Sequence, residues 1–82
     1  MVRVVFDYHF EKKVKKIKDN LLKTKVKKQI LKIAAFPEIG KLMRYTRKNT
    51  REVYIPPFRL SYLYIKEEDK LIFLDLYHKD EQ

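Results

Sequence analysis

The sequence contains no cysteine, and it has only one glycine and three prolines among its 82 residues. Without cysteine the chain can form no disulfide and offers no thiolate to a metal, so its stability must come from hydrophobic packing or from a partner. The absence of cysteine fits a reducing, intracellular compartment, and we expect a cytoplasmic protein.

Long apolar runs are also missing. No stretch approaches the roughly 20 apolar residues of a membrane span, and the first ten residues, MVRVVFDYHF, lack the apolar run of a signal peptide. We therefore expect a chain that is neither exported nor embedded in a membrane. A chain of 82 residues is also too short for two hydrophobic cores, which predicts a single domain over residues 1–82.

Basic residues are abundant and unevenly distributed. Twenty Lys and Arg stand against eleven Asp and Glu, for a net charge of +9. Residues 1–51 hold sixteen basic and four acidic side chains, whereas residues 52–82 hold four basic and seven acidic ones. Such an asymmetry favours a polyanionic partner such as RNA, or an acidic protein. The alternative is a lysine-rich surface of the kind that stabilises proteins from thermophiles.

The first part of the sequence has the spacing of a short strand followed by an amphipathic helix. Val2, Val4 and Phe6 alternate with other positions, as in a strand. Asp7 marks the start of a helix, in which apolar residues recur every three or four positions and lysines fill the positions between them. The apolar residues are Phe10, Val14, Ile17 and Leu21, and the lysines are Lys12, Lys13, Lys15, Lys16 and Lys18.

A second helix is predicted after a break at Asp19-Asn20. Its apolar stripe consists of Leu22, Val26, Ile30, Ile33 and Ala34. Pro37 ends it, because proline disfavours helical geometry in the residue before it. Two such helices, near residues 8–35, are expected to pack as an antiparallel hairpin.

Gly40 marks a change to the alternating period of strands. Strands are predicted over Lys41 to Arg47, Arg51 to Ile55, Phe58 to Lys66 and Leu71 to His78. Pro56-Pro57 must interrupt strand pairing, since neither proline has an N–H to donate. The sequence thus predicts an α+β domain of order β-α-α-β-β-β-β, in which an N-terminal strand and an antiparallel helical hairpin precede a four-stranded antiparallel run that completes one sheet. The helices cover one sheet face and leave the other open.

Strand alternation predicts which side chains face the helices. We expect Phe58, Leu60, Tyr62 and Tyr64 on the core face, together with Ile72, Leu74 and Leu76. Arg59 then lies on the open face, with Asp75, Tyr77 and Lys79 from the last strand. Arg59 and Lys79 are expected to meet there.

Most enzyme motifs are absent from the sequence. It has no glycine-rich phosphate loop, no cysteine nucleophile and no histidine pair at metal-ligand spacing, so no metal and no small-molecule cofactor is expected. What remains is a set of basic and aromatic residues suited to RNA, because guanidinium groups bind phosphates and aromatic rings stack on unpaired bases. The set comprises Arg44, Arg47, Lys48, Arg51, Tyr54, Arg59, Tyr62, Tyr77, His78 and Lys79, and the helical lysines Lys12, Lys13, Lys15 and Lys16 are further candidates for RNA contacts.

The second half of the chain resembles the RelE/ParE toxin superfamily. In that family a Lys-Leu segment precedes an Arg-containing strand, then an aromatic-Arg-aliphatic-x-Tyr strand, then a last strand that ends in His-Arg or His-Lys. The matching segments here are Lys41-Leu42, Arg51 to Ile55, Phe58-Arg59-Leu60-Ser61-Tyr62 and Tyr77-His78-Lys79. The β-αα-β order agrees with the family fold, so the resemblance covers essentially the whole chain.

The resemblance implies a toxin of a type II toxin-antitoxin pair, neutralised by a cognate antitoxin protein. In the RelE branch it implies an endoribonuclease that cleaves mRNA on the ribosome without a metal and so inhibits translation. On this reading Arg59 matches the arginine that contacts the scissile phosphate, Lys79 takes the place of a second basic residue, and Arg51 lies near the family's basic pair.

The sequence departs from the family pattern at three places. Tyr54 stands where the second member of the basic pair is expected, and Pro56-Pro57 replaces a glycine-containing turn. No tyrosine follows His78-Lys79, where many members carry a catalytic one, which makes Tyr54, Tyr77 and His78 the candidates to substitute for it. Two other functions stay open: a ParE-like inhibitor of DNA gyrase, and a non-catalytic basic module that binds nucleic acid or an acidic protein.

Overall fold

The computed structural model describes residues 2–43 and 49–78. Its elements are β1 (Arg3–Phe6), α1 (Tyr8–Lys15), α2 (Asn20–Ala35), β2 (Lys41–Leu42), β3 (Thr50–Ile55), β4 (Phe58–Ile65), a 3-10 turn (Lys66–Glu68) and β5 (Lys70–His78). This order confirms the predicted α+β class. Four candidate residues, Arg44, Arg47, Lys48 and Lys79, lie outside the described residues.

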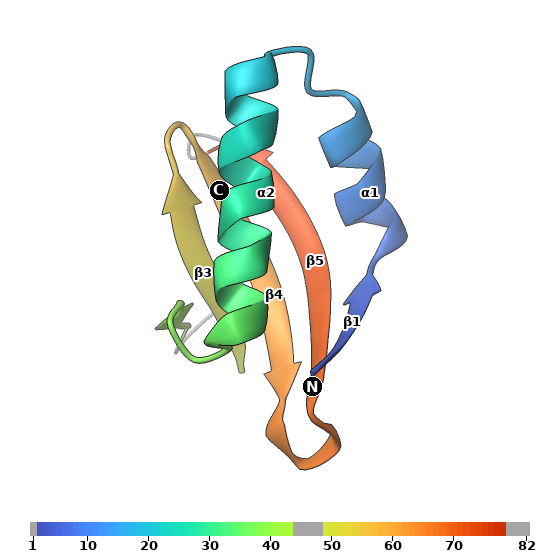
Figure 1. Ribbon diagram of the computed structural model, residues 1–82, viewed down its shortest axis with the longest axis vertical. Coiled ribbons are helices and arrows are strands. Elements are labelled where there is room, and N and C mark those ends of the chain that lie inside the picture. Colours follow the sequence, from blue (N-terminus) through green and yellow to red (C-terminus); the bar gives the residue numbers. More distant parts are fainter. Residues whose placement is uncertain (1, 44–48, 79–82) are drawn as a thin grey trace.

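The strands form one sheet in the order β1-β5-β4-β3-β2 (Figure 1). The run from β2 to β5 is antiparallel, as predicted, with Pro56-Pro57 as the turn between β3 and β4. The N-terminal strand β1 instead lies parallel to the last strand, with Val5 opposite Ile72, so the sheet is mixed. Figure 1 shows α1 and α2 running in opposite directions over the sheet.

An aspartate starts each helix. The Asp7 carboxylate accepts a hydrogen bond from the His9 N–H at 2.9 Å, and the Asp19 carboxylate accepts one from the Leu21 N–H at 2.9 Å. Such caps satisfy donors that have no partner within a helix. Because Asp19 starts a new helix, Leu21 does not continue the stripe of α1 as predicted: it lies on the outside of α2, 64% exposed.

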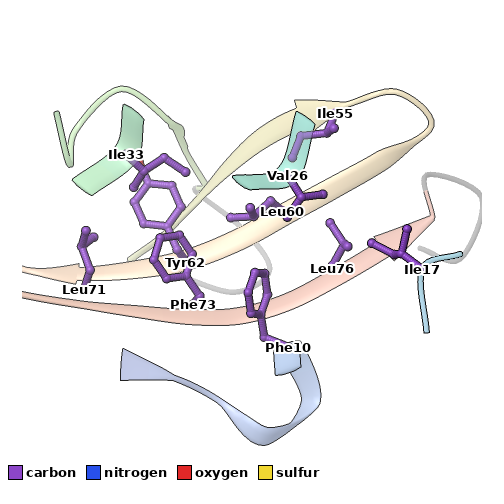
Figure 2. Close-up of a cluster of buried hydrophobic side chains, with 10 residues drawn as sticks. All are labelled: Phe10, Ile17, Val26, Ile33, Ile55, Leu60, Tyr62, Leu71, Phe73 and Leu76. Atoms are coloured by element: carbon purple, nitrogen blue, oxygen red, sulfur yellow. The ribbon is translucent and has the colours of Figure 1, made fainter. Parts of the chain in front are cut away.

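The hydrophobic core lies between the helices and the three inner strands of the sheet, β3, β4 and β5 (Figure 2). The helices contribute Phe10, Val26 and Ile33, the segment between them contributes Ile17, and the sheet contributes Ile55, Leu60, Tyr62, Leu71, Phe73 and Leu76. Partly buried side chains, Ile30 among them, pack around this cluster. The predicted apolar faces of both helices and of β4 are therefore confirmed, apart from Leu21.

The predicted core face of β5 is wrong for two residues. Leu71 and Phe73 are fully buried, whereas Ile72 and Leu74 are only partly buried. The cause is a β-bulge, an extra residue in one strand of a pair, which reverses the alternation beyond it. Leu76 follows the bulge and is buried as predicted.

The strand register locates this bulge. Ser61 lies opposite Asp75, but the next residue, Tyr62, lies opposite Phe73, so Leu74 has no partner position in β4. The bulge places Leu76 in the core and turns Tyr77 to the face that the helices do not cover.

Tyr62 fixes the connection between α2 and β2. Its hydroxyl donates a hydrogen bond to the Pro37 carbonyl at 2.7 Å and accepts one from the Gly40 N–H at 2.9 Å. A Cβ at position 40 would lie 2.6 Å from the Tyr62 oxygen, so only glycine fits there. Burial raises the pKa of the Tyr62 phenol above its ordinary value, while the Gly40 hydrogen bond and the charge of Arg51 act to lower it.

Tyr62→Phe is expected to lower the free energy of unfolding by about 1–3 kcal/mol, because it leaves a buried N–H and a carbonyl without their partner. A phenol whose pKa is raised by folding stabilises the protein fully below its unfolded pKa of about 10 and loses that contribution as the pH rises further. Urea unfolding at neutral pH and above pH 10 checks both effects. The stability difference between wild type and variant should shrink at alkaline pH, and the exposed Tyr8→Phe serves as control.

Candidate phosphate-binding site on the open sheet face

Two adjacent rows of side chains cross the sheet face that the helices leave open. In one row Arg59 of β4 lies between Tyr54 of β3 and Tyr77 of β5. In the next row Ser61 lies between Glu52 and Asp75. The residues that alternate with these rows, such as Leu60, pack into the core beneath the helices, which places the two rows on the opposite face.

Arg59 is held between a carboxylate and an aromatic ring. Its Nη1 lies 3.6 Å from Oε1 of Glu52, and its Cζ lies 5.9 Å from the centroid of the Tyr54 ring. The side chain is 35% exposed. Its Nε–H is buried and has no hydrogen-bond partner within the described part of the chain. The guanidinium is thus oriented, and a ligand can reach only the part of it that remains exposed.

Glu52 is the buried centre of this arrangement. Its side chain is only 5% exposed, and its Oε2 accepts a short hydrogen bond from the hydroxyl of Tyr77, itself buried. A carboxylate removed from water needs such partners, because burying a bare charge costs several kcal/mol. Arg59 is one of these partners, whereas Asp75 of the same row lies with its Oδ1 3.5 Å from Nζ of Lys13.

Two predicted catalytic residues do not join Arg59. Arg51 lies on the helix side, where its Nη1 donates hydrogen bonds of 3.0 Å to the carbonyls of Glu38 and Gly40. His78 follows Tyr77 and so points to that same side, edge-on against Phe58 at 5.6 Å between ring centroids. Arg51 and His78 thus contact the backbone or the core in this structure, although the resemblance made them candidates for catalysis.

Of the tyrosine candidates, Tyr54 is the accessible one. Its side chain lies beside Arg59 and the residue is 53% exposed. Tyr77 lies equally near in the row, but its hydroxyl is engaged with Glu52. The lysines of α1 stand apart on the helix surface, and among them Lys13 contacts the sheet through Asp75. Their contact with RNA stays a prediction.

Glu52 is the site residue that the sequence-based set omitted. The signal for it was present, because Glu52 and Tyr54 are two residues apart and must share a face of β3.

Within residues 2–43 and 49–78, no group of three or more His, Cys, Asp or Glu side chains is arranged to hold a metal ion. No helix in these ranges is long and apolar enough to cross a membrane.

Solved structures with a similar fold include bacterial toxins. The toxin in the crystal structure of the intact E. coli RelBE toxin-antitoxin complex superposes with a TM-score of 0.80 at 16% identity, over 95% of this chain and 96% of that chain. The RelBE2 complex from Mycobacterium tuberculosis gives 0.79 at 20% identity, over 95% and 98% of the chains. A metal-bound toxin from Helicobacter pylori gives 0.73 at 22% identity, over 99% and 98%. At these identities the likeness shows the fold.

The family follows from the sequence match. Residues 4–82 match the family model described as ParE toxin of type II toxin-antitoxin system, parDE, and the chain therefore belongs to this toxin family of the RelE/ParE superfamily. No curated protein sequence matches the chain.

Tyr77→Phe is expected to lower the free energy of unfolding by about 1–3 kcal/mol, because the buried Glu52 carboxylate loses a hydrogen-bond donor. Tyr54→Phe removes a hydroxyl from the same row on an exposed ring and is the matched control, with an expected change below about 0.5 kcal/mol. Thermal unfolding of the three proteins measures the difference. Equal losses in both variants would contradict a stabilising contact between Tyr77 and Glu52.

Proposed function

We propose that this toxin inhibits translation by cleaving mRNA on the ribosome. The observation that carries the proposal is the position of Arg59: it lies on the open face, its side chain is 35% exposed, and it is oriented by Glu52. A partly exposed guanidinium in a fixed orientation is suited to bind a phosphodiester through two parallel hydrogen bonds. The likeness in fold to RelE toxins also supports this proposal.

The proposed reaction is transesterification at the scissile phosphate. The ribose 2′-oxygen loses its proton and attacks phosphorus, the bond to the 5′-oxygen breaks, and that oxygen takes up a proton. A 2′,3′-cyclic phosphate and a free 5′-hydroxyl result. Arg59 binds the non-bridging oxygens and stabilises the charge that develops on them. The exposed ring of Tyr54 beside it offers a surface on which an unpaired base stacks.

Two observations favour a second candidate, inhibition of DNA gyrase. The family model that matches residues 4–82 is that of the ParE toxins. In addition, the Glu52 carboxylate next to Arg59 opposes phosphate binding. A protein that inhibits gyrase by contact needs no phosphate-binding arginine on its open face.

Arg59→Ala is expected to slow mRNA cleavage on the order of 100-fold or more, as does the loss of one donor in comparable oxyanion sites. Purified toxin, translating ribosomes and a reporter mRNA provide the assay, and the cut sites are read by primer extension. Arg3→Ala is the matched control, because Arg3 is an exposed arginine whose partner is Glu68. Circular dichroism verifies that both variants fold.

The same preparation discriminates the candidates. Codon-phased cuts in wild type that disappear in Arg59→Ala support the proposed nuclease. Intact mRNA together with lost gyrase supercoiling supports the second candidate. If mRNA stays intact and gyrase supercoiling is unaffected, the remaining candidate is a non-catalytic basic module.

The cognate antitoxin is proposed as the stable partner of the chain. The toxin carries a charge of +9, and large apolar side chains remain exposed on its surface, including Tyr8, Leu31 and Phe36. Such side chains are available as contacts for a partner. An acidic chain with apolar anchors complements both features.

Adding the product of the neighbouring gene should therefore raise the melting temperature of the toxin, since a ligand that binds only the folded state stabilises it by mass action. The shift should grow with antitoxin concentration and fall with salt. Thermal unfolding of toxin, antitoxin and mixture measures it. An unchanged transition in the mixture would exclude the pairing.

A further inference from the structure

A buried negative charge lies in contact with the cation proposed to bind phosphate. Glu52 is 5% exposed, and its Oε1 lies 3.6 Å from Arg59 Nη1. Its other oxygen is held by the Tyr77 hydroxyl, so the carboxylate cannot turn away without losing that bond. Contacts with Arg59 of β4 and Tyr77 of β5 thus fix the position of the Glu52 carboxylate. Its negative charge stays close to any anion that reaches Arg59.

The energetic consequence follows from Coulomb's law. Charges near a protein surface interact several times more strongly than charges in bulk water, and buried charges are poorly screened by salt. An RNA phosphate at Arg59 is attracted by the guanidinium and repelled by the Glu52 carboxylate behind it. The repulsion lowers the net attraction that Arg59 alone would give.

We propose that Glu52 is a positioning residue with two opposing effects: it holds Arg59 and Tyr77 in place on the open face, and its charge keeps the affinity of the site for free RNA low. A site of this kind acts on RNA that another particle already holds in place, and it leaves free RNA alone. The inference rests on the proposed function, because it concerns the phosphate that Arg59 binds there.

The experiment measures binding of a short fluorescein-labelled single-stranded RNA to the purified toxin, without ribosomes, at several salt concentrations. Glu52→Gln removes the charge and keeps an oxygen for the Tyr77 hydroxyl. It should bind about tenfold more tightly at low salt, the change expected when a nearby like charge is removed. The slope of log affinity against log salt should steepen by about 0.7, the value for one more neutralised phosphate of single-stranded RNA.

Three further variants separate charge at the site from other effects. Glu67→Gln changes the net charge equally but lies in the turn at the far end of the β4–β5 hairpin, so its binding should match wild type closely. Glu52→Asp keeps the charge and should keep the weak binding. In an Arg59→Ala background, Glu52→Gln should no longer steepen the salt slope. Glu52→Ala also removes the charge, so whichever of Glu52→Gln and Glu52→Ala folds, as verified by circular dichroism, decides the test.

The outcomes are distinct. Tighter binding in Glu52→Gln or Glu52→Ala, absent in Glu67→Gln and dependent on Arg59, supports the inference. An equal gain in Glu67→Gln, or no gain in a folded charge-free variant, overturns it while Arg59→Ala still weakens binding. If Arg59→Ala leaves both RNA affinity and ribosomal cleavage unchanged, the proposed function itself fails.

Discussion

The β-bulge at Leu74 determines which side chains meet on the open face of the sheet. Before it, Leu71 and Phe73 point to the helices, and a regular strand would continue that pattern through residues 75 and 77. The extra residue puts Leu76 into the core and Tyr77 on the other face, beside Arg59. Because the Tyr77 hydroxyl then reaches Glu52, the orientation of the buried carboxylate, and through it that of Arg59, depends on this one irregularity.

The elements could be read from the sequence because their signals are local. Asp7 and Asp19 cap helices within a few residues, and Pro56-Pro57 interrupts strand pairing wherever it occurs. The bulge and the parallel pairing of β1 with β5 are different in kind, since both depend on the register between strands far apart in the sequence. The alternation of β5 read in isolation therefore placed Ile72 and Leu74 in the core.

The difference between local signals and strand register also explains which site residues could be predicted. Arg59 follows Phe58 and precedes Leu60, so its place on the open face follows from alternation within one strand. Arg51 and His78 belong to other strands, and their faces depend on how those strands pair with β4. The family resemblance suggested that Arg51, Arg59 and His78 belong to one site. The strand register instead places Arg51 and His78 on the other face and brings Glu52 next to Arg59, and pairing between strands cannot be read from one strand alone.

The ion pair between the buried Glu52 and the partly exposed Arg59 is better explained by positioning than by stability. Replacing such a pair with well-packed apolar residues is often neutral or stabilising, because desolvation offsets much of the attraction between the charges. An 82-residue chain without disulfides has little stability to spare. What apolar residues cannot supply is a guanidinium fixed in one orientation with an exposed surface. The Glu52 carboxylate supplies the orientation, and its charge opposes the binding of any anion that Arg59 attracts. If Arg59 binds a phosphate as proposed, the Glu52 carboxylate 3.6 Å from its Nη1 lowers the strength of that binding, and a further charge brought close by a partner would change it again.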